Sequence, residues 1–288
     1  MGPILDVTVK LSATNPLGSP APRPVTRPGL ADSHVHLHAY DDQAIDDMLG
    51  RAYEVGVEIV VAVSVDLASS SRTLEVARRY RADAHTNRPV VIPAIGFHPA
   101  LIVDAPNEAD WREFDRLAAS PDVALIGECG IDGIANPSRL DIQLEILTHQ
   151  VRIATHLDLP VNLHLREPAF INSAIQVLSQ GGIRRDRGVA HYFVGDQQLA
   201  ERYLAAGLLL SVGKPVTRQE NQTLREAIRD VPLDRLLLET DTYPAQGRGT
   251  EPADVRLVAE SVAELKGISF DEVAKATTAN LRRLLRKH

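Results

Sequence analysis

The chain of 288 residues predicts an α/β protein with the architecture of a (β/α)8 TIM barrel. Three observations lead to this prediction. Strand-like and helix-like segments alternate from Gly29 onward, and the strand-like segments number eight. Several of them are continuous Val, Ile and Leu runs, as expected for parallel strands buried on both faces. Parallel strands need crossover helices, and eight such units can close on themselves. A doubly wound open sheet is the alternative architecture.

The expected elements follow one another with short connections. The strands are expected at 30–38, 58–65, 90–98, 124–131, 161–165, 188–193, 208–212 and 235–240. Amphipathic stretches at 41–55 and 138–157 carry apolar residues at helical spacing, and 251–266 and 270–286 are expected as two successive helices. Residues 29–288 therefore predict a single barrel domain.

The first 28 residues differ from the rest of the chain because they contain six prolines, which disfavour helix. We expect a proline-rich leader that is extended, with a short strand at 4–11, or poorly ordered. A role of this leader in docking a protein partner stays open at this point.

Composition indicates the class of protein. The hydrophobic content of 44% supports a large core, and the single cysteine, Cys129, excludes an internal disulfide framework and fits a reducing cytoplasm. No apolar run approaches the roughly 18 residues of a membrane span, and no signal peptide is evident. The net charge of −7 argues against broad adhesion to nucleic acid through a basic surface. Bound divalent cations would reverse the charge locally, so a nucleic-acid enzyme is not excluded.

Histidines and carboxylates stand at the ends of several expected strands. His34 and His36 end the first strand, and residues two apart on a strand point the same way. Further candidates end strands four, five, six and eight, namely Glu128, His164, His191 and Asp241. In a barrel of this kind the carboxyl ends of the strands form the active-site face. Converging imidazoles and carboxylates are the ligands of hydrolytic metal centres, so we expect a metal site there.

Neighbouring residues allow more than one interpretation. His98 ends strand three before Pro99, where it has either a substrate role at the rim or a packing role. Glu239 shares a strand face with Asp241 and either supports the site or belongs to a barrel layer. Cys129 should point away from Glu128 on its strand and is expected to be an inert buried thiol.

The sequence resembles the TatD-type metal-dependent deoxyribonucleases, a family of amidohydrolase-like barrels. The resemblance runs from Leu30 to the carboxyl terminus. Its motifs are Asp-Ser-His-Val-His-Leu (32–37), Ile-Gly-Phe-His-Pro (95–99), Gly-Glu-Cys-Gly-Ile-Asp (127–132), Leu-Pro-Val-Asn-Leu-His-Leu-Arg (159–166), His-Tyr-Phe (191–193) and Leu-Leu-Glu-Thr-Asp (237–241). The family usually has Asp at the position of His38, and it commonly reads Ser-Pro-Tyr where this chain has Thr-Tyr-Pro (242–244).

The resemblance implies a site with two divalent ions, which could be magnesium, manganese or zinc. One ion would be bound by His34, His36 and Asp241, the other by His164 and His191, and Glu128 would bridge them. Asp241 and Glu128 are then the catalytic residues, with Asp241 as general base. The expected substrate contacts are Arg166, which offers a planar donor pair to phosphate, together with His98 and His38. The implied substrate is DNA, as ends or single strands.

Two other functions stay open at this stage. The same kind of site hydrolyses ester, lactone or amide bonds, as an aminoacyl-tRNA deacylase would. Recognition of phosphate by Arg166 separates a nuclease from such a hydrolase. A non-catalytic scaffold that docks through the leader is the third hypothesis.

Overall fold

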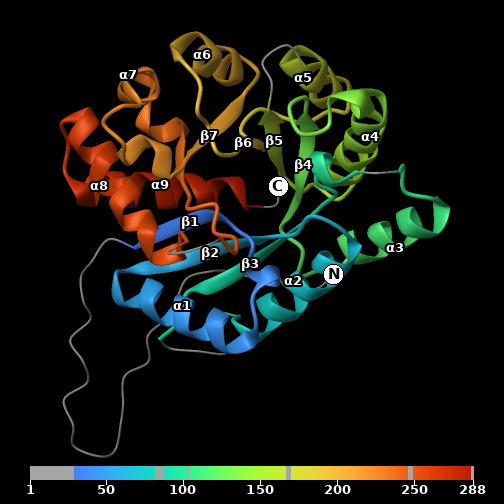
Figure 1. Ribbon diagram of the computed structural model, residues 1–288, viewed down its shortest axis with the longest axis horizontal. Helices are drawn as coiled ribbons and strands as arrows, with labels where there is room; N and C mark the ends of the chain where they lie inside the picture. Colours follow the sequence, from blue (N-terminus) through green and yellow to red (C-terminus); the bar gives the residue numbers. More distant parts are fainter. Residues whose placement is uncertain (1–28, 82–86, 103, 167–169, 246–248, 287–288) are drawn as a thin grey trace, which may run out of the picture.

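The chain folds as one ring of parallel strands surrounded by helices (Figure 1). The structure is a computed structural model and describes residues 29–81, 87–102, 104–166, 170–245 and 249–286; the predicted leader lies outside them. The strands are β1 (Leu30–Val35), β2 (Val57–Val63), β3 (Val90–Ile95), β4 (Leu125–Asp132), β5 (Val161–Arg166), β6 (Gly188–Ala190), β7 (Leu208–Val212) and β8 (Leu236–Leu238). They pair in sequence order in one eight-stranded sheet, which confirms the predicted (β/α)8 TIM barrel.

The helices lie outside the strands and cover the ring. They are α1 (Asp42–Glu54), α2 (Leu67–Arg79), α3 (Glu108–Ala118), α4 (Leu140–His156), α5 (Ile171–Gln180), α6 (Gln197–Ala205), α7 (Gln222–Asp230), α8 (Val255–Lys266) and α9 (Phe270–Leu284). Short 3-10 helices occupy several connections: η1 (Leu37–Ala39), η2 (Pro99–Leu101), η3 (Pro137–Arg139), η5 (Lys214–Thr217), η6 (Leu233–Arg235) and η7 (Pro252–Asp254). No helix in the described residues is long and apolar enough to cross a membrane.

The barrel closes where β8 meets β1, and residues predicted as metal ligands form this seam. The backbone N–H of Asp241 donates to His34 O at 3.0 Å, and that of His36 donates to Thr242 O at 2.8 Å. Val35 and Thr242 form an isolated parallel bridge at the same place. Closure of the ring therefore brings Asp241 beside the two histidines of β1.

Several strands are shorter than the sequence predicted. β1 ends at Val35, and His36 precedes the 3-10 helix η1 with φ −100° and ψ 63°. The ladder between β1 and β2 also has a register shift between Asp32 and Val35. The first strand was therefore predicted too long at its carboxyl end, because His36 follows the strand. The Nε2 atoms of His34 and His36 nevertheless turn to the same side, 3.2 Å apart.

The interior of the barrel is apolar at the amino-terminal end of the strands. One cluster joins Ala31, Ile59, Val61, Val63, Ala94, Leu125, Val189, Leu209 and Leu237 with Leu281 and Leu284 of α9. Helix α9 is fixed over this end because Asn280 Nδ2 donates to Leu236 O at 2.9 Å and Arg187 Nη1 donates to Leu284 O at 2.7 Å. The amino-terminal end of the ring is thereby closed by apolar side chains and by α9.

Candidate metal centre

The six predicted ligands come together at the carboxyl-terminal end of the barrel, around the carboxylate of Glu128. This side chain projects from β4 and is only 1% exposed. Its neighbours Gly127 and Gly130 have positive φ values of 148° and 146°, and a Cβ at either would overlap the backbone of β5. Glycine at these positions lets β4 approach β5 closely enough to place Glu128 among its partners.

One group of ligand atoms surrounds Oε2 of Glu128. His34 Nε2 lies 3.3 Å from this oxygen, and His36 Nε2 lies 3.5 Å from it. Asp241 Oδ1 lies 3.5 Å from His36 Nε2 and 3.9 Å from His34 Nε2. We call these three residues with Glu128 Oε2 the first ligand group.

A second group surrounds the other oxygen of the same carboxylate. Glu128 Oε1 lies 2.6 Å from His164 Nδ1 and 2.9 Å from His191 Nε2. We call these two histidines with Glu128 Oε1 the second ligand group. The two oxygens of one side chain thus face two separate sets of nitrogen and oxygen donors.

Neutral oxygen acceptors contact the histidines of the first ligand group at Nδ1, the ring nitrogen that faces away from Glu128. His34 Nδ1 lies 3.1 Å from the side-chain oxygen of Asn162, and His36 Nδ1 lies 3.1 Å from the carbonyl oxygen of Val63. An oxygen acceptor fixes the ring proton on the nitrogen that faces it. Each Nε2 therefore presents a lone pair toward the centre, as a metal ligand requires.

The histidines of the second ligand group are held from behind by carboxylates. His164 Nε2 lies 3.0 Å from Asp132 Oδ2. His191 Nδ1 lies 3.4 Å from Glu239 Oε1, an ion-pair distance, and has no hydrogen-bond partner among the described residues. The hydrogen bond to Asp132 turns the lone pair of His164 Nδ1 inward, while Glu239 places negative charge beside the Nδ1 of His191.

This arrangement fits divalent cations. His34 Nε2 and His36 Nε2 are 3.2 Å apart, and His191 Nε2 and His164 Nδ1 are 3.3 Å apart. Two lone pairs at such distances repel each other, and a cation between them removes the conflict. Glu128 Oε2 is buried without a hydrogen-bond partner in the described part of the chain. Imidazole nitrogens with carboxylate oxygens are a donor set for zinc, manganese or iron.

The pKa shifts of the two carboxylates also favour a cation site. Burial would raise the pKa of Glu128, but the adjacent His191, His98 and His34 bring it well below its usual range. Burial would also raise the pKa of Asp241, yet its contact with His36 lowers it to about 2. Within the described residues no lysine or arginine pairs with either carboxylate. The centre is thus a buried anionic site that favours positive charge.

His98 also reaches the centre, but it presents an N–H group there, whereas the ligand histidines present lone pairs. It precedes η2, where its Nδ1 accepts a hydrogen bond from the backbone N–H of Ala100 at 3.0 Å. A neutral imidazole with an accepting Nδ1 carries its proton on Nε2. That nitrogen lies 3.1 Å from Glu128 Oε1. His98 is therefore a hydrogen-bond donor aimed into the site.

The other two predicted substrate residues lie outside both ligand groups. His38 Nδ1 is 3.1 Å from the same Val63 carbonyl that holds His36, and burial lowers the pKa of His38 to about 4. Arg166 ends β5 with an exposed side chain and makes no ion pair within the described residues. The structure therefore places Arg166 on the rim rather than in the centre.

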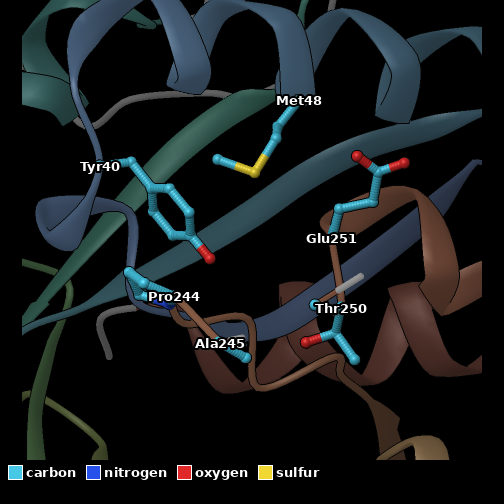
Figure 2. A pocket seen from close by; sticks show the side chains of 7 residues that line it. Tyr40, Met48, Pro244, Ala245, Thr250 and Glu251 are labelled. Carbon is cyan, nitrogen blue, oxygen red and sulfur yellow. The ribbon is translucent and has the colours of Figure 1, made fainter. Parts of the chain in front are cut away.

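Two hollows adjoin the rim. A cavity of about 350 Å³ lies between the segment after β1 and the segment after β8, with Tyr40 and Met48 facing Pro244 and Ala245 (Figure 2). A second cavity of about 540 Å³ lies between the segments after β2 and β3 and reaches His98. Both are large enough to accept parts of a substrate beside the centre.

Sequence reasoning assigned no role to two residues that support the ligands and left a third undecided. These are Asp132, Asn162 and Glu239. Each stands an even number of positions from a predicted ligand of the same strand or its extension, so strand alternation was a usable signal. Alternation does not tell which ring nitrogen each of them contacts.

Comparison with known proteins agrees with this geometry. The family model described as TatD related DNase matches residues 31–286. YabD of Bacillus subtilis is 33% identical over 89% of this chain and 99% of its own, and YcfH of Escherichia coli is 34% identical over 88% and 95%. Both are named as uncharacterized metal-dependent hydrolases.

Solved structures show the same fold. The TatD homologue YjjV of Escherichia coli superimposes with a TM-score of 0.77 and 26% identity, over 89% of this chain and 97% of its own. A TatD family hydrolase of Entamoeba histolytica gives a TM-score of 0.77 at 20% identity, over 91% of this chain and 99% of its own. The barrel, its donor-lined end and the family match together show that this chain belongs to the TatD family of metal-dependent hydrolases.

Proposed function

We propose that the protein is a deoxyribonuclease that hydrolyses phosphodiester bonds of DNA with two divalent ions. The observation that carries this proposal is the division of the donors into two ligand groups on the two oxygens of Glu128. Paired divalent ions are typical of enzymes that cleave phosphodiesters by in-line displacement. The family description as TatD related DNase supports the same substrate.

In this proposal each ligand group holds one ion. His34, His36 and Asp241 would hold the first, His164 and His191 would hold the second, and Glu128 would offer one carboxylate oxygen to each. When bound, the ions supply Lewis acidity toward the phosphate and lower the pKa of the attacking water.

Two protein groups move protons in the proposed reaction. The water oxygen forms a bond to phosphorus while the bond from phosphorus to the leaving sugar oxygen breaks. The carboxylate of Asp241, which is ionised because its contact with His36 lowers its pKa, accepts the proton of the water. His98 Nε2–H donates a proton to the leaving oxygen, because its accepting Nδ1 keeps that proton on the side of the centre.

Two exposed arginines of the rim are proposed to bind the flanking phosphates. Arg166 ends β5, and Arg218 follows η5 after β7; neither guanidinium forms a hydrogen bond or ion pair within the described residues. Sequence reasoning missed Arg218. The segment after strand seven is a frequent phosphate site in barrels of this fold. His38 lies beside His36 and is proposed to contact substrate through its ring.

The experiment is cleavage of end-labelled single- and double-stranded DNA by metal-stripped protein. Magnesium, manganese or zinc is restored singly, and the control is the double variant Glu128→Ala/Asp241→Ala. We expect cutting that requires a metal and falls by more than about 10³-fold in the double variant, which corresponds to about 4 kcal/mol. Tight metal binding without cutting under any ion would remove DNA as the substrate.

A second arm tests phosphate recognition. Arg166→Ala and Arg218→Ala should each weaken DNA binding about 10- to 160-fold, since charge-assisted hydrogen bonds contribute roughly 1.5–3 kcal/mol. The matched control is Arg152→Ala, an exposed arginine on α4 away from the rim. Full activity of both rim variants, with hydrolysis of a small ester, would instead favour the ester, lactone or amide hydrolase.

A further inference from the structure

We infer that Asp132 and Glu239 are positioning residues that hold His164 and His191 from behind and set the affinity of the second ligand group for its ion. This inference rests on the metal part of the proposed function and not on DNA as the substrate. It assigns a role to two buried carboxylates that touch neither ion nor substrate in the proposed reaction.

Asp132 is fixed by its own turn before it contacts the histidine. Its side chain is 1% exposed, and Oδ1 accepts the backbone N–H groups of Ile134 at 2.9 Å and Ala135 at 2.7 Å. The backbone N–H of Asp132 donates to Gln143 Oε1 at 2.8 Å. These contacts leave Oδ2 to accept from His164 Nε2 at 3.0 Å, so the carboxylate behaves as a rigid support.

Glu239 supports both a ring and a segment of backbone. It is fully buried, and Oε1 accepts the backbone N–H of Tyr192 at 2.5 Å while lying 3.4 Å from His191 Nδ1. Tyr192 adopts φ 47°, a left-handed conformation that a bulky residue rarely takes without a compensating contact. Its ring lies against Gly213, where even a Cβ would come within 3.1 Å. The carboxylate therefore fixes the chain directly after His191 together with the His191 ring.

Charge distinguishes the two ligand groups. The first group has an anionic ligand of its own, Asp241, and its histidines are backed by an amide and a carbonyl. The second group has no carboxylate except the shared Glu128. Carboxylates behind a ligating histidine raise its basicity and stabilise the bound cation. The second group thus has less negative charge among its own ligands, and Asp132 and Glu239 supply that charge on the far side of the two histidine rings.

The number of charges agrees with this role. Around the centre stand four carboxylates, Glu128, Asp132, Glu239 and Asp241, and none pairs with a lysine or arginine in the described ranges. Glu239 Oε2 is also buried without a hydrogen-bond partner among those residues. Buried carboxylates without a cation are costly, and two divalent ions carry the four positive charges that balance them.

The test is titration of metal-stripped protein with Co²⁺, followed by affinity and by the visible spectrum of the bound ion. Asp132→Asn and Glu239→Gln remove the charge and keep the shape of the side chain. Two Co²⁺ ions should bind in two steps. We expect each variant to lower the Co²⁺ affinity of one step, that of the second ligand group, by about 10- to 100-fold, and to leave the affinity of the other step within about twofold. The conservative variants Asp132→Glu and Glu239→Asp retain the charge and should recover part of the affinity.

A matched control is Asp32→Asn. Asp32 is fully buried and bonded to Thr240, but it contacts no ring of either ligand group. Its substitution should leave the Co²⁺ affinity and the Co²⁺ spectrum of the second ligand group unchanged.

The outcomes separate this inference from the proposed function. Unchanged Co²⁺ affinity and spectrum in both amide variants would overturn the inference, as would an equal loss at both steps. Reduced unfolding stability of the metal-free variants without any change in affinity would also overturn it, because it indicates a structural role alone. Absence of DNA cleavage in the wild-type protein would overturn the substrate proposal and leave the inference intact.

Discussion

The two ends of the barrel interior differ in almost every physical property. At the amino-terminal end, apolar side chains from most of the strands meet Leu281 and Leu284 of α9, and the interior is closed. At the carboxyl-terminal end, histidines and carboxylates meet within hydrogen-bond distances, and a few of their buried polar atoms have no hydrogen-bond partner among the described residues. The first arrangement gains stability by burying apolar surface. The second gathers buried carboxylates beside histidines.

Stability and chemistry therefore depend on opposite ends of the same strands. β4 illustrates this, because Leu125 lies in the apolar cluster at its amino-terminal end and Glu128 lies in the metal centre at its carboxyl-terminal end. Substitutions at the amino-terminal end should therefore change stability and leave activity unchanged, and substitutions at the carboxyl-terminal end should do the reverse. Substitutions at each end, and removal of the metal, test that separation.

His98→Gln should lower the rate of DNA cleavage by about 10²- to 10⁴-fold, because the position loses the proton donor that faces Glu128. This loss corresponds to roughly 3–5 kcal/mol in the activation barrier. Stability and metal affinity should stay near those of the wild type, as measured by denaturant unfolding and metal titration. A loss of metal binding at normal stability would mean that His98 is a ligand and would contradict its assignment as a donor.

Leu209→Ala should destabilise the protein by about 2–5 kcal/mol, because Leu209 is fully buried in the closed end and its truncation leaves a cavity. The turnover rate of the folded protein should not change. Urea unfolding and initial rates at low temperature measure the two quantities. Leu257→Ala, at a site on α8 that is 45% exposed, is the control and should cost far less. An altered turnover rate in Leu209→Ala would show that the layers are coupled.

Metal removal should lower the unfolding free energy, because the carboxyl-terminal end then keeps its buried carboxylates without cations. At an ion concentration 100-fold above the dissociation constant, binding to the native state contributes about 2.7 kcal/mol per site. Thermal unfolding with and without a chelator measures the difference. Glu128→Gln should lose most of this increment, since it removes the carboxylate shared by both ligand groups. Equal stability with and without metal would contradict the proposed site.

The fold and the positions of the ligands followed from local patterns in the sequence. Apolar runs that end in Glu128, His164, His191 and Asp241 predicted strands whose polar ends meet on one face, and the structure brings these residues together. Such apolar runs indicate strands that are buried on both faces, and the burial of these strands stabilises the barrel.

The supporting contacts could not be predicted in the same way. They depend on ring orientation and on register between strands, as when Asn162 of β5 meets His34 of β1 across the barrel. The path of His36 was also missed, because the shift in the β1–β2 ladder leaves no mark in the hydrophobic pattern. The leader at 1–28 stays a prediction, since it lies outside the described residues.

The seam between β1 and β8 has a consequence for the nascent protein. β1 leaves the ribosome well before β8, yet Asp241 and the backbone of Thr242 complete the surroundings of His34 and His36. β1 can pair with β2 as soon as that strand follows it, but its other edge has no partner among the described strands until β8 emerges. In the proposed two-ion site the first ligand group is therefore complete only after β8 has emerged, and a chain interrupted before that point has the two histidines of the group without Asp241 beside them.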